Sequence, residues 1–182
     1  MNEKYKLTNE KITTNDGKTL YRIQALQTFD DIKEGDLGGY VEAEANLSQY
    51  NKCWVYGNAK VFDRGRIHDH AKVYDNVEVF DEAQVYEFAL IHGNAKLFDA
   101  AEVHDRAKIY DNVIICNSAE VCGYSKIYNK IRIEGLSRIC DEILGQKTQD
   151  ATIPKKQNAE DVLNKNPIDI PFKVAIPHNS TS

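Results

Sequence analysis

An aliphatic residue recurs at every sixth position of this 182-residue chain, from Val55 to Ile139, without one interruption. A second, mostly small residue stands two positions before each of them, as Ala71 does before Val73. Alternate side chains of a strand point to one face, so both positions should face inward. Two residues after each aliphatic comes Asp, Glu, Asn or Gly, and these types favour turns or tolerate positive φ. Each hexapeptide therefore predicts a short strand followed by a corner.

A longer repeat indicates how many hexapeptides make one coil. Asn58, Asn76, Asn94 and Asn112 recur at every eighteenth position and are missing from the corners between them. Asparagine accepts the left-handed backbone conformation better than other residues that carry a Cβ, so a stacked asparagine ladder at one corner fits this spacing. Three hexapeptides should form one coil, and residues 53–142 should form an all-β, parallel β-helix of about five coils.

The two ends of the chain do not follow the repeat. Residues 1–52 should form an N-terminal β cap, in which Asn15-Asp16-Gly17 marks a hairpin turn and Gly38-Gly39 a second reversal. Such a cap would keep the open end of the coils from pairing with another chain. Residues 143–182 should form an extension made of a polar linker from Gln146 to Lys156, a short helix and a C-terminal edge strand.

The predicted edge strand alternates apolar and polar residues and contains a proline, which excludes a central place in a sheet. Its apolar residues are Ile168, Ile170, Phe172, Val174 and Ile176, and the first four are candidate interaction residues. This strand could add to the chain's own coils, to a second copy or to a foreign protein, and the sequence leaves the three open.

Composition and charge narrow the classes of function. No stretch approaches the roughly 18 apolar residues that a bilayer span needs, and the N-terminus lacks the apolar core of a signal peptide. We therefore expect a cytoplasmic protein with no membrane partner. The four cysteines have no CxxC spacing, so we interpret them as reduced thiols rather than as a disulfide framework or a zinc site. The net charge of −5 argues against direct binding of nucleic acid and favours a protein partner or a small ligand.

The residue after each aliphatic should point outward, and it is often aromatic or histidine. Taken at every eighteenth position, these side chains form three rows. The Tyr row is Tyr56, Tyr74, His92, Tyr110 and Tyr128; the Phe row is Phe62, Phe80, Phe98 and Cys116; the His row is His68, Tyr86, His104, Cys122 and Cys140. The Phe row, with Ile114 beside it, is an apolar stripe and a candidate interface. The alternative is that the stacked rings only support the coils.

Charges also follow the coils. Asp63, Asp81 and Asp99 should stack along one edge, and a row of carboxylates can imitate nucleic acid. The residues before the aliphatics on one face alternate in sign, however, from Lys60 through Glu78 to Lys96. This alternation favours ion pairing on a solvated face over mimicry.

The pattern aliphatic, x, Asp/Gly, Asn, Ala, x resembles the hexapeptide-repeat superfamily over about half of the chain. This resemblance implies a left-handed parallel β-helix and often CoA-dependent acyl transfer. The segments from Leu20 to Leu26, Gly35 to Glu42, Asn46 to Ser48 and Cys53 to Tyr56 look like a narrower branch, met in bacteriophages and prophages, with acetyltransferase-like relatives.

An acyltransferase of this kind would need a general base, which the resemblance implies to be a histidine. The candidates are His68, His92 and His104, with His70 as a further imidazole. Aspartates stand beside His68 and His104, but the repeating corner already accounts for them. The unbroken hexapeptides also leave no loop that would cover an acceptor or cofactor. We therefore assign no catalytic residue, no cofactor and no metal, with acetyl-CoA only under the enzyme alternative.

The function that we predict is a non-catalytic protein-interaction module, expected to be phage-encoded, that binds or inhibits a host protein such as a defence complex. It should form a homo-oligomer. The alternative is a CoA-dependent acyltransferase of the hexapeptide-repeat type, and the third interpretation is a structural repeat protein.

Overall fold

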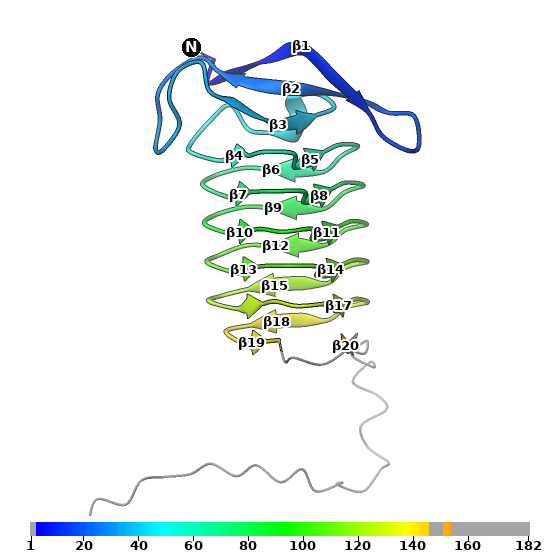
Figure 1. Cartoon of the computed structure of the whole chain (residues 1–182). Helices are drawn as coiled ribbons and strands as arrows, with labels where there is room; N and C mark the ends of the chain where they lie inside the picture. Colours follow the sequence, from blue (N-terminus) through cyan, green and yellow to red (C-terminus); the bar gives the residue numbers. More distant parts are fainter. Residues whose placement is uncertain (1–2, 146–150, 154–182) are drawn as a thin grey trace, which may run out of the picture.

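The computed structural model describes residues 3–145 and 151–153, which form a β-solenoid of about six turns beneath an N-terminal hairpin (Figure 1). Three sheets run along the rod, and their strands pair parallel except within the N-terminal cap. The nine-stranded sheet holds β1 (Tyr5–Thr13), β2 (Thr19–Ala25), β3 (Leu37–Val41), β5 (Lys60–Val61), β8 (Glu78–Val79), β11 (Lys96–Leu97), β14 (Ile114–Ile115), β17 (Ile131–Ile133) and β20 (Ala151–Ile153). The six-stranded sheet holds β4 (Trp54–Val55), β7 (Lys72–Val73), β10 (Leu90–Ile91), β13 (Lys108–Ile109), β16 (Lys126–Ile127) and β19 (Ile143–Leu144). The five-stranded sheet holds β6 (Arg66–Ile67), β9 (Gln84–Val85), β12 (Glu102–Val103), β15 (Glu120–Cys122) and β18 (Arg138–Cys140).

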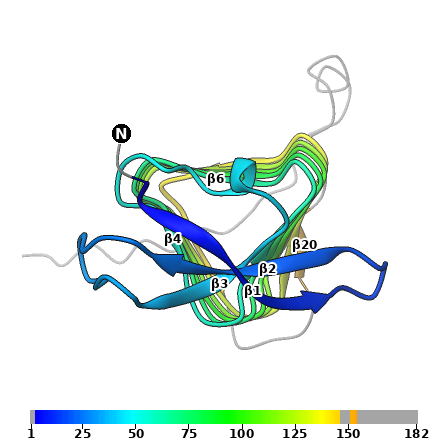
Figure 2. The same ribbon diagram turned by 90° about the horizontal axis from the view of Figure 1, so that it is seen from above.

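The coils repeat with the predicted spacing and are left-handed. Val73 pairs with Ile91 and Ile91 with Ile109, so each residue lies beside its equivalent in the next hexapeptide triplet. Figure 2 looks along the rod from its N-terminal end, and β4, β20 and β6 mark three sides of a triangular outline. The chain passes from the side of β4 to the side of β20 and then to β6 counter-clockwise as it moves away from the viewer. Both the all-β class and the parallel coils predicted from the repeat are confirmed.

The interior of the prism is made by the two inward positions of each hexapeptide. Every aliphatic position from Val55 to Ile139 is buried, and so is the residue two places before it. Removal of this apolar surface from water, at roughly 25 cal/mol per Å², is the main force that holds the coils together. The phase of the predicted core is therefore correct.

The corners depend on residues that accept a left-handed backbone. Asp75, Asp99 and Asp111 have φ values of 57°, 57° and 59°. The asparagine ladder is present: the side-chain amide of Asn76 donates a hydrogen bond of 3.1 Å to Asn94, and that of Asn94 donates one of 3.2 Å to Asn112. These asparagines do not hold the left-handed conformation that we expected of them, because the residue before each one adopts it. The asparagines instead join successive coils through a line of side-chain hydrogen bonds.

The cap closes the first coil with aromatic side chains. β1 and β2 form an antiparallel hairpin whose turn contains Gly17 at φ 89°, as predicted. Gly38-Gly39 does not reverse the chain but lies inside β3, where a Cβ on Gly39 would come within 2.5 Å of the Ala59 carbonyl oxygen. The absence of a side chain at these glycines lets the cap backbone approach the coils closely. Phe29 packs edge-on against the buried Trp54, with ring centroids 5.4 Å apart.

The solenoid extends past both ends of the predicted repeat. Val41 pairs with Val61 and Val61 with Val79, so the first coil is longer than the second by two positions. A 3-10 turn, Glu44–Asn46, lies in that first coil. β19 and β20 lie in the part that we assigned to a linker and extension, and β20 pairs parallel with β17. The predicted short helix and edge strand, with Ile168, Ile170, Phe172 and Val174, lie outside the described residues.

Candidate functional site: a basic groove along one face

The six-stranded sheet carries a charge pattern unlike that of the other two. Its outward positions, one from each strand in order, are Trp54, Lys72, Leu90, Lys108, Lys126 and Ile143, and none of them is acidic. Lys108 and Lys126 are direct neighbours on β13 and β16. Like charges opposite each other on adjacent strands destabilise a sheet, so this pair has a cost that the fold does not require.

The nine-stranded sheet compensates its charges. In the nine-stranded sheet, Glu78 accepts ion pairs from Lys60 at 3.0 Å and from Lys96 at 2.7 Å. Burial opposes the ionisation of Glu78, but the two ammonium groups outweigh it and lower the pKa of its carboxyl group. The ion pairing predicted for this face is confirmed. The lack of acidic residues at the outward positions is therefore particular to the six-stranded sheet and does not hold for the nine-stranded one.

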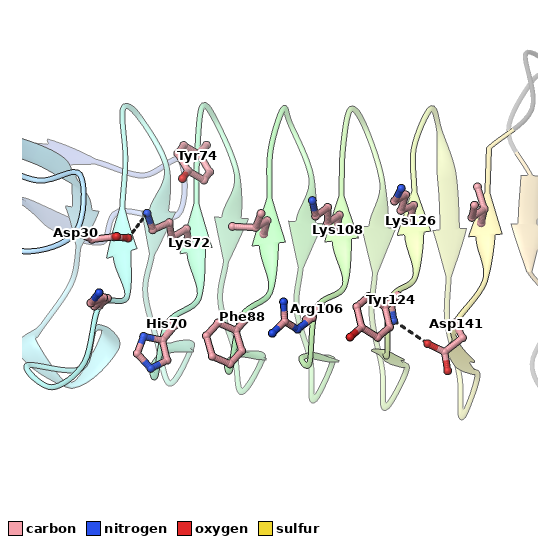
Figure 3. Close-up of a pocket in the computed structure, with 13 residues that line it drawn as sticks. Asp30, His70, Lys72, Tyr74, Phe88, Arg106, Lys108, Tyr124, Lys126 and Asp141 are labelled. Atoms are coloured by element: carbon pink, nitrogen blue, oxygen red, sulfur yellow. Dashed lines mark hydrogen bonds and ion pairs between the residues drawn. The ribbon is translucent and has the colours of Figure 1, made fainter.

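A second line of side chains forms a wall beside the lysines (Figure 3). It consists of the corner residues that precede the strands of the six-stranded sheet: His70, Phe88, Arg106, Tyr124 and Asp141. The guanidinium of Arg106 lies between two rings, 5.2 Å from the centroid of Phe88 and 5.9 Å from that of Tyr124. Phe88 and Tyr124 are 50% and 69% exposed. His70 stacks on Phe88 with ring centroids 4.8 Å apart, and Arg106 also lies against both rings, so a ligand can reach their edges and the cation between them.

Together the two lines enclose a groove with a volume of about 1060 Å³, which we call the basic groove. Its floor is Lys72, Leu90, Lys108, Lys126 and Ile143, and its ends are marked by Asp30 and Lys52 on one side and Asp141 on the other. Each strand adds about 4.8 Å along the rod. The shape is an open channel and not an enclosed cavity, which suits an extended ligand.

The positive charges in the basic groove differ in their availability. Lys72 is neutralised by Asp30 and Asp31, both at 2.6 Å, on the loop between β2 and β3. Burial opposes the charge of Lys72, but these carboxylates outweigh it and raise the pKa of the ammonium group. In the part of the chain that the structure describes, Lys108 and Lys126 have no ion-pair partner. With Arg106 they form a cluster of cations that can receive an anionic ligand.

The candidate catalytic histidines are not brought together. His68 and His104 lie on the His row, where His68 Nδ1 is 3.0 Å from Asp69 and His104 Nε2 is 2.9 Å from Glu120. His92 lies on the Tyr row, stacked between Tyr74 and Tyr110. Burial lowers the pKa of the His92 imidazole. The basic groove, as far as the described residues form it, is lined by His70 and by none of these three.

The Phe row is partly covered by the protein's own cap. Phe62 is 7% exposed and packs against Leu20 and Tyr40 of the cap, whereas Phe80 and Phe98 are half-buried. Their rings stack with centroids 5.0 Å and 5.2 Å apart, and Ile114 is half-buried on β14. The sequence makes this row a candidate interface, but at Phe62 the protein's own cap covers it.

The interpretation of all four cysteines as reduced thiols is wrong for two of them. Cys122 and Cys140 stand directly opposite each other on β15 and β18, with Cα atoms 4.6 Å apart, and form a disulfide. No CxxC motif marks this pair, because one full coil of 18 residues brings the two cysteines together. Cys53 and Cys116 are buried thiols outside the disulfide.

The basic groove was missed in the sequence, although a signal for it exists. Lys72, Lys108 and Lys126 occupy one position of the longer repeat, and His70, Phe88, Arg106 and Tyr124 occupy another. On the face of Lys60, Glu78 and Lys96 the equivalent positions alternate in sign. On the neighbouring face the equivalent positions hold Lys72, Lys108 and Lys126 with no acidic residue among them.

Comparison with known proteins adds no family. No protein-family model matches the chain, and no curated protein matches it. Among the residues that the structure describes, no helix has the length and apolar character needed to cross a membrane.

Proposed function

We propose that this protein is a non-catalytic binding protein whose basic groove holds an acidic segment of a partner protein. One observation carries the proposal: among the described residues, Lys108 and Lys126 lie side by side without a counter-ion, next to Arg106, whereas the lysines of the nine-stranded sheet are paired with Glu78. A carboxylate ligand would relieve the repulsion between the two ammonium groups. It would also gain charge-assisted hydrogen bonds from the guanidinium.

The remaining surface of the groove suits a peptide. Leu90 and the exposed Ile143 give the floor two apolar contacts, and Phe88 and Tyr124 give the wall two exposed rings. Aromatic residues and arginine are the types that dominate binding energy in protein interfaces. An extended peptide of about seven residues, at roughly 3.3 Å each, would run the length of five coils.

A nucleic acid fits this face less well. Within residues 3–145, only Arg106, Lys108 and Lys126 stand free of ion pairs at the centre of the groove, whereas a nucleic acid is held by many phosphate contacts. The exposed corner aspartates Asp75 and Asp111 flank the Tyr row on the same side of the rod, and they would repel a long polyanion. A short acidic segment avoids those carboxylates.

The finer identity of the partner rests on resemblance. We propose that the coils belong to the hexapeptide-repeat superfamily and to its phage and prophage branch, and that the partner is a protein of the host cell, for example of a defence complex. In this proposal the protein acts in the cytoplasm. The segments from Leu20 to Leu26 and from Gly35 to Glu42 support this origin.

The binding proposal is tested with a fluorescein-labelled peptide of ten glutamates, titrated with the full chain and followed by fluorescence anisotropy. The Lys108→Glu/Lys126→Glu variant should weaken binding at least about tenfold, because it removes two charge-assisted contacts. Binding should also weaken as salt is raised. The matched control is Lys6→Glu/Lys11→Glu on the exposed face of β1, which changes the net charge equally.

Three results would contradict the proposal. The peptide does not bind at low salt; both double variants lose affinity equally, which would indicate an effect of net charge alone; or a labelled ten-nucleotide single-stranded DNA binds the groove more tightly than the peptide. The last result would replace the protein partner by a nucleic acid.

A further inference from the structure

The His row changes from rings to sulfur toward its C-terminal end. Tyr86 and His104 stack with centroids 4.8 Å apart, and the next two positions are Cys122 and Cys140. Cys122 is 2% exposed and Cys140 is half-buried. Because His104, Cys122 and Cys140 belong to successive strands of the five-stranded sheet or follow them directly, the backbone fixes their spacing along the rod.

Carboxylates surround these residues. Glu120 lies on β15 and points to the same face as Cys122; its two oxygens are 2.9 Å from His104 Nε2 and 3.0 Å from Arg138 Nε. Asp105 is 3.4 Å from the other imidazole nitrogen, Nδ1. Donor atoms of His104, Asp105 and Cys122 lie within 4.8 Å of one another, and so do those of Glu120, Cys122 and Cys140. Cys122 belongs to both groups, so the donors form one continuous cluster.

We propose that the reduced protein binds one zinc ion here, through the thiolates of Cys122 and Cys140, the carboxylate of Glu120 and the imidazole of His104. Sulfur and nitrogen donors select zinc over magnesium or calcium. Two sulfurs bound to one tetrahedral zinc at about 2.3 Å would be about 3.8 Å apart, a separation that two cysteines directly opposite on adjacent strands can provide. His104 approaches from the coil before Cys122 and Cys140 from the coil after it.

The surroundings support this assignment. A histidine that binds a metal commonly donates its other ring N–H to a carboxylate, and Asp105 stands at that place for His104. Stacking on Tyr86 holds the ring. Two thiolates and one carboxylate exceed the charge of the zinc ion by one, and the guanidinium of Arg138 balances the difference. This inference is independent of the basic groove, which lies on another sheet.

The structure describes the oxidised form, in which Cys122 and Cys140 are bonded to each other and cannot act as thiolates. A dithiol reductant converts it to the binding form. The Sγ–Sγ bond breaks and takes up two electrons, the reductant is oxidised to its own disulfide, and two protons leave with the formation of the two protein thiolates.

The test uses the full chain, reduced with a dithiol that is then removed without oxygen, and zinc stoichiometry measured by native mass spectrometry. Cobalt serves as a second probe, because thiolate-to-cobalt charge transfer reports sulfur ligation directly. We expect one zinc per reduced chain and none per oxidised chain. Cys122→Ser and Cys140→Ser should each weaken affinity by more than about 100-fold, and Asp105→Asn by about 10 to 100-fold, the range for residues that orient a ligand.

The matched control is Cys116→Ser, since Cys116 is also buried and follows a strand of the nine-stranded sheet, away from the cluster. It should bind zinc like the wild type. Far-UV circular dichroism checks that each variant keeps its fold. The proposal is overturned if the folded, reduced wild type binds no zinc, if the oxidised protein binds it equally, or if the Cys122→Ser/Cys140→Ser variant retains wild-type affinity.

Discussion

The backbone N–H of Asn129 donates a hydrogen bond of 2.8 Å to the carboxylate of Asp111, which occupies the same corner one coil earlier. The same contact joins Gly93 to Asp75 at 2.8 Å and Asn117 to Asp99 at 2.9 Å. A corner aspartate therefore both adopts the left-handed conformation and binds the next coil. This structural double role accounts for the recurrence of aspartate at the corners, so no catalytic role is needed to explain it.

Replacement of Asp111 by alanine should lower the free energy of unfolding by about 2 kcal/mol, because alanine at positive φ is strained and the Asn129 N–H loses its acceptor. Asp111→Asn should cost less than about 1 kcal/mol, since asparagine tolerates this conformation and keeps an oxygen. Urea denaturation followed by circular dichroism measures both. Equal losses in the two variants would contradict this account.

Ile91→Asp should unfold the rod, with a loss of at least about 4 kcal/mol, because it places an unpaired charge in a fully buried position. Leu90→Asp is the matched control on the same strand: Leu90 points outward into the basic groove, so this variant should melt cooperatively near the wild-type temperature. Thermal melts of the two proteins decide it. A soluble, cooperatively melting Ile91→Asp variant would refute the assignment of the core.

Lys108→Glu should separate stability from binding. The new carboxylate would stand opposite Lys126 and replace repulsion by attraction, which should stabilise the free protein by about 0.2 to 1 kcal/mol. The same change should weaken binding of the glutamate peptide. Chemical denaturation and anisotropy on one preparation measure both effects. If stability falls instead, the two lysines do not repel each other as the geometry implies.

The homo-oligomer predicted from the sequence is tested on the half-buried part of the Phe row. In a two-fold dimer through this face, Phe80→Glu would bring like charges together and split the dimer, while the outward side chain leaves the core intact. Analytical ultracentrifugation of wild type and variant, with circular dichroism as the folding control, gives the answer. If both sediment as the same monomer, this face does not hold two copies together.

Stability should fall as the pH is lowered through the range below about 6.5, in part because of His92. Burial between Tyr74 and Tyr110 lowers the pKa of its imidazole below the ordinary value of 6.5, so the unfolded chain takes up a proton before the folded one does. The contribution is complete above pH 6.5 and is lost as the pH falls. His92→Phe keeps a ring in the stack but cannot titrate. Its melting temperature should therefore drop less than that of the wild type between pH 7.5 and pH 5.5, and an equal drop would exclude His92 as the cause.

The repeat in the sequence was sufficient to predict the core and the coil length, because each inward position is fixed by its neighbours in the adjacent hexapeptides and in the coils on either side. It failed where the spacing changes. Val41 and Leu47 also stand one hexapeptide apart and enter the first coil, but the longer corner before Cys53 puts them out of phase with Val55. A pattern search that requires one unbroken phase cannot include them.

The sites were harder to predict than the coils for a different reason. Burial of Phe62 depends on how the β1–β2 hairpin folds down over the rod, and that contact joins Leu20 to a residue far along the chain. The Cys122–Cys140 pair and the neighbouring Lys108 and Lys126 were accessible in principle, since the partners of each pair are separated by one full coil. The cysteines already follow each other in the His row, whereas the lysines lie in a row outside the three aromatic ones.

Because the coils are in register, the rod can be shortened or lengthened only by whole coils without changing which side chains face inward. Removal of residues 76–93 would join Asp75 to Asn94, bring one corner to its equivalent in the next coil and leave every remaining side chain facing as before. A deletion that is not a whole number of coils would bring unlike corners together. Each whole coil added or lost changes the distance between the two ends of the basic groove by about 4.8 Å. The number of coils therefore sets the length of ligand that this face could span.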